Sequence, residues 1–208
     1  MKWFTTVIRL VFLTVFLLLM IKGKVILWLG LFALSLIAAV FLGRVYCGYA
    51  CPMNTLMIPS DWLGKKMKIQ TNRIPAWLQN KPIAWIALIF SLVSMLLAKR
   101  VLQINIPVLP IWLVVSVLVT LRYQPSVFHN LVCPFGPLQK WFGKWALFSK
   151  KVNPDACIGC KLCEKVCPST AIQVSKDNRK AVITSALCHQ CTNCQAVCPK
   201  DAIHYQKT

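Results

Sequence analysis

The chain has few acidic side chains: five Asp and Glu stand against 24 Lys and Arg in 208 residues. The formal net charge is therefore +19, and 57% of the residues are hydrophobic. Both values lie outside the range of ordinary soluble domains. They exclude a large soluble enzyme and a disordered chain, and they favour a membrane protein with a soluble appendage.

Several kinds of site also lack the residues that they need. The chain has three histidines, and none lies in an apolar run, which excludes a membrane haem held by two histidines. No glycine-rich fingerprint precedes a predicted helix, so nothing indicates bound NAD or FAD. No Ser/His/Asp or Cys/His arrangement indicates a hydrolase.

Four apolar runs predict four transmembrane helices. They cover residues 3–21, 25–42, 83–98 and roughly 106–121. The first two are near the ~20 residues that cross a bilayer, whereas the last two are shorter. Pro107 and Pro110 begin the fourth run, where neighbouring helices or water can satisfy the freed carbonyls. No cleavage site follows the first run, so we expect a retained helix and not a signal peptide.

The basic residues gather on one side of these spans. The loop after the second span holds Arg44, Lys65, Lys66, Lys68, Arg73 and Lys81, and the tail begins with Arg122, Lys140, Lys144, Lys150 and Lys151. The positive-inside rule then predicts a multi-pass protein of the inner (cytoplasmic) membrane with both termini in the cytoplasm. The charges favour anionic lipid and not nucleic acid as the partner. Arg9 lies near the inner interface, where we expect it to reach the head groups.

Eight of the eleven cysteines form a duplicated pattern in the tail. Cys157, Cys160, Cys163 and Cys167 are spaced C-x2-C-x2-C-x3-C before Pro168, and Cys188, Cys191, Cys194 and Cys198 repeat this before Pro199. Ala-Ile follows each run, at residues 171–172 and 202–203. The tail resembles a bacterial-type ferredoxin with two 4Fe-4S clusters and a small α+β fold.

In such ferredoxins the fourth cysteine of each run binds the other cluster, because a short loop supplies only three thiolates. One predicted cluster therefore uses Cys157, Cys160, Cys163 and Cys198, and the other uses Cys188, Cys191, Cys194 and Cys167. Structural zinc usually takes two C-x2-C pairs, and disulfides are rare in the cytoplasm. We expect His189 and His204 to be solvated or to lie beside a cluster. The nearby Lys161, Lys165 and Lys200 are expected to raise the cluster potentials.

The other three cysteines belong to a second repeat. Cys47-Gly-Tyr-Ala-Cys51-Pro52 follows the second span, and His129-Asn-Leu-Val-Cys133-Pro134 follows the fourth. A Trp and Lys segment comes after each turn, at residues 62–65 and 141–144. The predicted membrane domain is thus 1–150, with repeats 1–80 and 81–150 that each end in a C/H-x3-C-P turn. The ferredoxin domain follows at 151–208.

Four spans, two such turns and a two-cluster tail resemble the NapH-type membrane polyferredoxins over essentially the whole chain. The family's second turn has cysteine where this chain has His129. Cys47, Cys51, Cys133 and His129 all fall on one membrane face and are a candidate third iron–sulfur site, in which histidine would raise the potential. The alternative is that the turns are structural and their cysteines are small buried hydrophobes.

The resemblance implies an electron-transfer subunit of a quinol-linked oxidoreductase complex. In the first hypothesis, electrons pass between menaquinol or ubiquinol and a partner oxidoreductase through the clusters. In the second, the chain is an electron relay anchor that does not react with quinone. In the third, it is an assembly factor whose clusters reduce a metal or thiol during maturation of another enzyme. Each hypothesis requires other subunits or protein partners.

Overall fold

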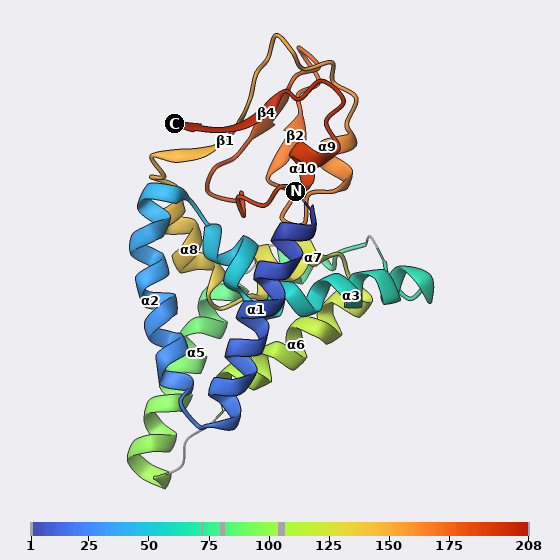
Figure 1. Ribbon diagram of the computed structural model, residues 1–208. Helices are drawn as coiled ribbons and strands as arrows, with labels where there is room; N and C mark the ends of the chain where they lie inside the picture. Colours follow the sequence, from blue (N-terminus) through green and yellow to red (C-terminus); the bar gives the residue numbers. More distant parts are fainter. Residues whose placement is uncertain (1, 72, 80–81, 104–106, 208) are drawn as a thin grey trace. The chain divides into compact units, whose positions relative to one another are not determined.

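The computed structural model describes residues 2–71, 73–79, 82–103 and 107–207 (Figure 1). The predicted basic residue Lys81 and the start of the predicted fourth span at 106 lie outside these ranges. The residues form two compact units. Unit 1 combines 1–55 with 138–208, and unit 2 covers 56–137. This grouping joins the N-terminal segment to the tail, whereas the predicted repeat boundary at 80 and domain boundary at 150 remain predictions from the sequence.

Unit 1 begins with a hairpin of two apolar helices, α1 (Lys2–Ile21) and α2 (Val25–Leu42). They run antiparallel in Figure 1. The rings of Phe16 and Trp28 meet edge to face with centroids 5.1 Å apart. The Trp28 indole N–H donates to the Tyr46 hydroxyl at 2.9 Å, which anchors the segment after α2 to the hairpin. Both helices are apolar on nearly every face, as expected for helices surrounded by lipid.

Among the residues that the structure describes, three helical segments are long and apolar enough to cross a membrane: Trp3–Ile21, Val25–Leu42 and Ile83–Val101. They correspond to the first three predicted spans. The fourth prediction corresponds to α6 (Val108–Arg122), which has 15 residues. At ~1.5 Å per residue this helix is shorter than a hydrocarbon core of ~30 Å. The structure therefore supports a membrane protein with three candidate spans, and the fourth span remains a prediction.

Unit 2 contains the helices that follow the first C/H-x3-C-P turn, up to and including the second turn. These are most of α3 (Pro52–Lys66), α4 (Ala76–Gln79), α5 (Ile83–Leu97), η2 (Ala98–Leu102), α6, α7 (Pro125–Val127) and η3 (Phe128–Val132). The Trp112 indole N–H donates to the Ser91 hydroxyl at 2.9 Å and joins α6 to α5. The Gln70 amide donates to Asp61 at 2.8 Å and to the Thr120 carbonyl at 3.1 Å. These bonds tie the amphipathic α3 segment to the end of α6.

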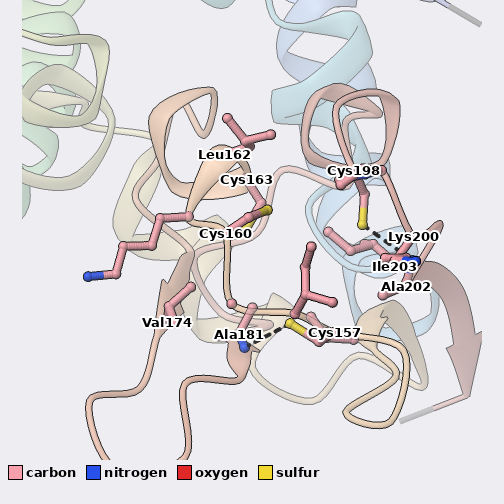
Figure 2. Close-up of a pocket in the computed structure, with 15 residues that line it drawn as sticks. Cys157, Cys160, Leu162, Cys163, Val174, Ala181, Cys198, Lys200, Ala202 and Ile203 are labelled. Atoms are coloured by element: carbon pink, nitrogen blue, oxygen red, sulfur yellow. Dashed lines mark hydrogen bonds between the residues drawn. The ribbon is translucent and has the colours of Figure 1, made fainter.

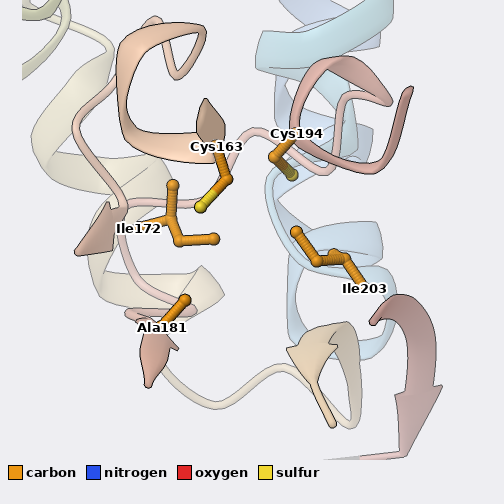
Figure 3. Packing of buried hydrophobic residues seen from close by; sticks show 5 residues of the cluster. All are labelled: Cys163, Ile172, Ala181, Cys194 and Ile203. Atoms are coloured by element: carbon orange, nitrogen blue, oxygen red, sulfur yellow. The ribbon is translucent and has the colours of Figure 1, made fainter. Parts of the chain in front are cut away.

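The tail follows α8 (Gly136–Gly143) and contains two short antiparallel sheets and two single-turn helices. Strand β1 (Phe148–Val152) pairs with β4 (Ile203–Lys207), and β2 (Ile172–Val174) pairs with β3 (Ala181–Ile183). The helices are α9 (Leu162–Lys165) and α10 (Asn193–Ala196). Its apolar core is Cys163, Ile172, Ala181, Cys194 and Ile203 (Figure 3). Two of these five residues are predicted cluster ligands, so the tail has little core apart from its cysteine sites.

Candidate iron–sulfur sites

The structure places the eight tail cysteines around two separate cavities. The outer site is lined by Cys157, Cys160, Cys163 and Cys198 and encloses about 370 Å³ (Figure 2). The inner site is lined by Cys167, Cys188, Cys191 and Cys194 and encloses about 300 Å³. Each set takes three cysteines from one run and the fourth from the other run. This is the partition that the crossed arrangement predicts, and iron binding by these residues forms part of the proposal below.

Backbone N–H groups point at the sulfurs of the crossing cysteines. The Ala171 N–H donates to Cys167 Sγ at 3.2 Å, and the Ala202 N–H donates to Cys198 Sγ at 3.3 Å (Figure 2 shows the second). The two bonds occupy equivalent positions in the duplicated tail, four residues after each crossing cysteine. A third bond joins the Ala181 N–H to Cys157 Sγ at 3.4 Å. Such donors stabilise thiolates bound to iron and raise cluster potentials, so these residues fit 4Fe-4S clusters.

The inner site is the more buried of the two. Cys188, Cys191 and Cys194 are each 7% exposed, whereas Cys160 of the outer site is exposed. Burial raises the pKa of Cys188 to about 12 and that of Cys194 to about 12, and neighbouring thiols add to both rises. At neutral pH these groups are therefore thiols until a metal binds. Loading iron at the inner site must displace their protons.

Each predicted C/H-x3-C-P turn is one turn of π-helix. The first is η1 (Tyr46–Ala50), closed by a bond from the Cys51 N–H to the Tyr46 carbonyl at 2.9 Å. The second is η3, closed by a bond from the Cys133 N–H to the Phe128 carbonyl at 2.8 Å. The two halves of the sequence repeat thus share a backbone conformation that is rare and often found at functional sites.

The four candidate ligands of the third site divide between the two units. In unit 1, Cys47 lies on η1 and Cys51 directly follows it; in unit 2, His129 lies on η3 and Cys133 directly follows it. Cys47, His129 and Cys133 are buried, at 8%, 5% and 7% exposure. The structure brings together the two residues of each turn, and a site made from all four stays a prediction. Among the described residues, no three His, Cys, Asp or Glu side chains gather closely enough to hold a single metal ion.

Within unit 1, turn η1 packs directly against the loop that carries Cys188, Cys191 and Cys194. A Cβ at residue 48 would overlap the carbonyl oxygen of His189, so only glycine permits this approach. The Tyr49 hydroxyl donates to the Gln190 carbonyl at 3.3 Å. Gln190 in turn donates to Ser149 Oγ at 2.9 Å and accepts from the Lys150 N–H at 2.9 Å. The inner site is therefore attached both to η1 and to strand β1.

The two tail histidines take the positions that the sequence analysis allowed: His189 lines the inner cavity at 1% exposure and lies beside the site, while His204 is exposed. Two arginines differ from the sequence expectations. Arg9 does not reach outward: it is 7% exposed, and its Nε–H donates to the Gly48 carbonyl at 2.8 Å. Arg44, which the sequence presents as one loop charge among many, is 1% exposed. The sequence signal that could have indicated this burial is the position of Arg44, directly after an apolar span and three residues before Cys47.

Comparisons with known proteins agree with the cysteine geometry. A family model described as a 4Fe-4S binding domain matches residues 25–70 and 105–154, and one described as a 4Fe-4S dicluster domain matches residues 156–202. The chain is an iron–sulfur protein. The first match covers both C/H-x3-C-P turns of this iron–sulfur protein, and the second covers all eight tail cysteines.

Two similar proteins come from Methanocaldococcus jannaschii, and both are uncharacterized. The iron–sulfur protein is 29% identical to MJ0749 over 141 residues, which are 65% of this chain and 55% of that protein. It is 27% identical to MJ0750 over 183 residues, which are 81% of this chain and 76% of that protein. The chain thus matches little more than half of the length of the first relative. No solved structure matches it.

Proposed function

We propose that this iron–sulfur protein is a membrane-bound electron carrier of the NapH type, which passes electrons between the quinol pool and a partner oxidoreductase. The observation that carries the proposal is the packing of the inner site on η1, at the end of span α2. Electron transfer between a lipid-soluble donor and a soluble partner needs redox centres at the membrane face. A ferredoxin tail attached to the end of a span supplies them there.

The proposed clusters occupy the two cysteine sites of the tail. The outer site would hold one 4Fe-4S cluster by Cys157, Cys160, Cys163 and Cys198, and the inner site another by Cys167, Cys188, Cys191 and Cys194. Each bound cluster supplies a one-electron couple. Oxidation of one quinol yields two electrons and two protons, so a tail with two such couples accepts both electrons, and both protons go to water.

An apolar cleft in unit 1 supports quinol as the lipid-soluble donor. It is an open cleft between α1, α2 and η1, with about 820 Å³ of space when its open part is included. Its lining includes Phe12, Leu31, Leu34, Ala38 and Tyr49. Ligand sites of this kind combine an apolar wall with a few polar groups that orient the ligand.

Two residues that line the cleft carry hydroxyl groups, and both hydroxyls are hydrogen-bonded to other parts of unit 1. Ser35 Oγ accepts from the Gln139 amide at 2.8 Å, and the Tyr49 hydroxyl donates to the Gln190 carbonyl beside the inner site at 3.3 Å. A quinol ring in this cleft would lie next to a side chain that touches the loop of the inner cluster.

The proposed location is the inner membrane, with both termini and the tail in the cytoplasm. The three candidate spans and the basic segments that flank them support this arrangement. Because both termini are placed on one side, the proposal requires α6 to cross as a fourth span.

The test is reduction by quinol of the full chain, purified without oxygen. Menaquinol and then ubiquinol are added to the oxidised protein, and the clusters are followed by electron paramagnetic resonance. We expect rapid reduction of both tail clusters by at least one quinol. Ala38→Phe, which fills the cleft, should slow this reduction at least tenfold and leave reduction by dithionite unchanged. Ala33→Phe is the matched control, because Ala33 lies on the exposed face of α2.

One result would contradict the proposed function, and a second would contradict only the proposed quinol cleft. Clusters that respond to dithionite but to neither quinol would leave the relay anchor or the assembly factor as the function. Rapid quinol reduction that is equally fast in Ala38→Phe would keep the function but place the quinol outside this cleft.

A further inference from the structure

Arg44 is a buried cation located between η1 and the inner site. It is 1% exposed, and its Nη1 donates to the carbonyls of Ala186 and Leu187 at 3.3 and 3.5 Å, just before Cys188. Its Nη2 lies 3.6 Å from Cys47 Sγ. One guanidinium therefore contacts the first C/H-x3-C-P turn and the segment leading into the inner cysteines.

No carboxylate pairs with Arg44 in the part of the chain that the structure describes, where the only ion pair is Lys65–Asp61. Its buried Nε also has no hydrogen-bond partner there. A buried charge is strongly destabilising unless an opposite charge compensates it. The surroundings of Arg44 thus require an anion, and a cluster held by four thiolates carries net negative charge.

Two further buried cations border the same site. Arg9 is 7% exposed and donates to the Gly48 carbonyl at 2.8 Å, and Lys150 is 4% exposed and donates to Gln195 Oε1 at 2.8 Å. The Gly48 that Arg9 bonds lies against the His189 carbonyl, next to Cys188, and the Gln195 that Lys150 bonds is the neighbour of Cys194 in the chain. Arg9, Arg44 and Lys150 are called the cation trio below.

The outer site has a different electrostatic environment. Lys161, Lys165 and Lys200, which the sequence suggested as potential-raising charges, are all exposed, so water and salt screen them. The cation bonded to this site is Lys180, whose Nζ donates to the Cys157 carbonyl at 2.7 Å and which is partly exposed. A charge in the trio is screened far less than these lysines, because it is buried.

We propose that the cation trio is the counter-charge of the inner cluster and selectively raises its reduction potential. The inference rests on the cluster sites of the proposed function. It adds a reason why an electron would be stabilised at the inner cluster, next to η1. Reduction adds one electron from the donor to the inner cluster, and no proton is required. Because that electron adds negative charge, the buried cations stabilise the reduced form more than the oxidised form.

The experiment is a redox titration of the anaerobically purified full chain with chemical mediators, followed by electron paramagnetic resonance. Iron and sulfide are measured first, to show that both tail clusters are present. Arg44→Met removes the charge but keeps the length of the side chain, and Arg44→Lys restores the charge. Arg9→Met and Lys150→Met remove the other two charges of the trio. Lys180→Met is the matched control at the outer site, and Lys24→Met removes a charge from the distant turn between α1 and α2.

We expect Arg44→Met to lower the reduced-to-oxidised ratio of one tail cluster about tenfold at a fixed potential. For a one-electron couple this corresponds to a fall of about 59 mV in the reduction potential of that cluster. Arg9→Met and Lys150→Met should lower the same couple, and Arg44→Lys should return most of the shift. Lys180→Met should lower only the potential of the other tail cluster, and Lys24→Met should leave both potentials unchanged. If Arg44→Met fails to assemble clusters, the Arg9→Met and Lys150→Met titrations decide the question.

The inference is overturned if the trio variants with intact clusters leave both potentials unchanged. It is also overturned if they lower the two potentials equally, or if Arg44→Met and Lys180→Met lower the same couple. None of these results depends on quinol, because mediators set the potential. A wild-type protein that quinol cannot reduce would instead contradict the proposed function and leave this inference standing.

Discussion

Cys167 and Cys198 each end one cysteine run yet line the cavity formed by the other run. A C-x2-C-x2-C loop turns too tightly to surround a cubane, so the fourth thiolate has to come from elsewhere in the chain. Each of these cysteines lies two residues beyond a single helical turn, and the Pro that follows it cannot continue a helix. Both crossing sulfurs also receive a backbone N–H, from Ala171 and Ala202.

Pairs of alanine substitutions test this crossing. Cys157→Ala with Cys198→Ala should remove one tail cluster only, because both residues line the outer site. Cys188→Ala with Cys198→Ala should remove both tail clusters, since each substitution opens a different site. Iron and sulfide content of the purified full chain is the measurement. Uncrossed clusters would reverse the two results.

At the scale of elements, the π-helical turn η1 is the point where the apolar hairpin meets the tail. Its backbone lies so close to the loop of Cys188 that Gly48 has no room for a Cβ beside the His189 carbonyl. Gly30, in the middle of span α2, would carry a Cβ with nothing within 4 Å. Residue 48 therefore has to be glycine, whereas residue 30 has room for a side chain, and the sequence alone does not distinguish the two positions.

Gly48→Ala should destabilise the protein by about 1–3 kcal/mol, the usual cost of forcing an extra methyl group into a packed region. The measurement is the temperature at which the full chain in detergent loses its cluster absorption. Gly30→Ala is the matched control and should be neutral or slightly stabilising, because alanine favours helix and its methyl group meets no neighbour. Equal midpoints for Gly48→Ala and the wild type would contradict the close packing of η1 on the tail.

At the scale of the whole molecule, the open question is whether the two turns supply a third centre. The family match to a 4Fe-4S binding domain spans both turns, which supports the prediction. The prediction is one cluster held by Cys47, Cys51, His129 and Cys133. The alternative is that both turns are purely structural.

His129→Ala should lower the iron content by one cluster and leave the signals of the tail clusters unchanged. Cys47→Ala should have the same effect, and the double variant should lose no more iron than either single variant. His204→Ala is the control, because His204 is exposed on β4. Unchanged iron in His129→Ala would leave only the structural interpretation of the turns.

The sequence by itself determined the parts of this protein that depend on local spacing. Apolar runs of sufficient length specify helices that can cross a membrane, and cysteines at fixed intervals specify the loops that present thiolates. The three candidate spans and the partition of the tail cysteines between two cavities follow from such patterns. The length of α6 was harder to predict, because the prolines at the start of its apolar run do not fix the residue at which the helix begins.

Only the tertiary structure decided which side chains surround the inner site. Arg44 meets Ala186 across 142 positions of sequence, and Arg9 meets Gly48 across 39. No periodicity encodes contacts of this kind, since they arise when segments far apart in the sequence pack together. In the sequence, Arg44 is one of 24 basic residues that suit a membrane face. In the folded chain it is a buried charge next to thiols, because packing removed the water that would otherwise have screened it.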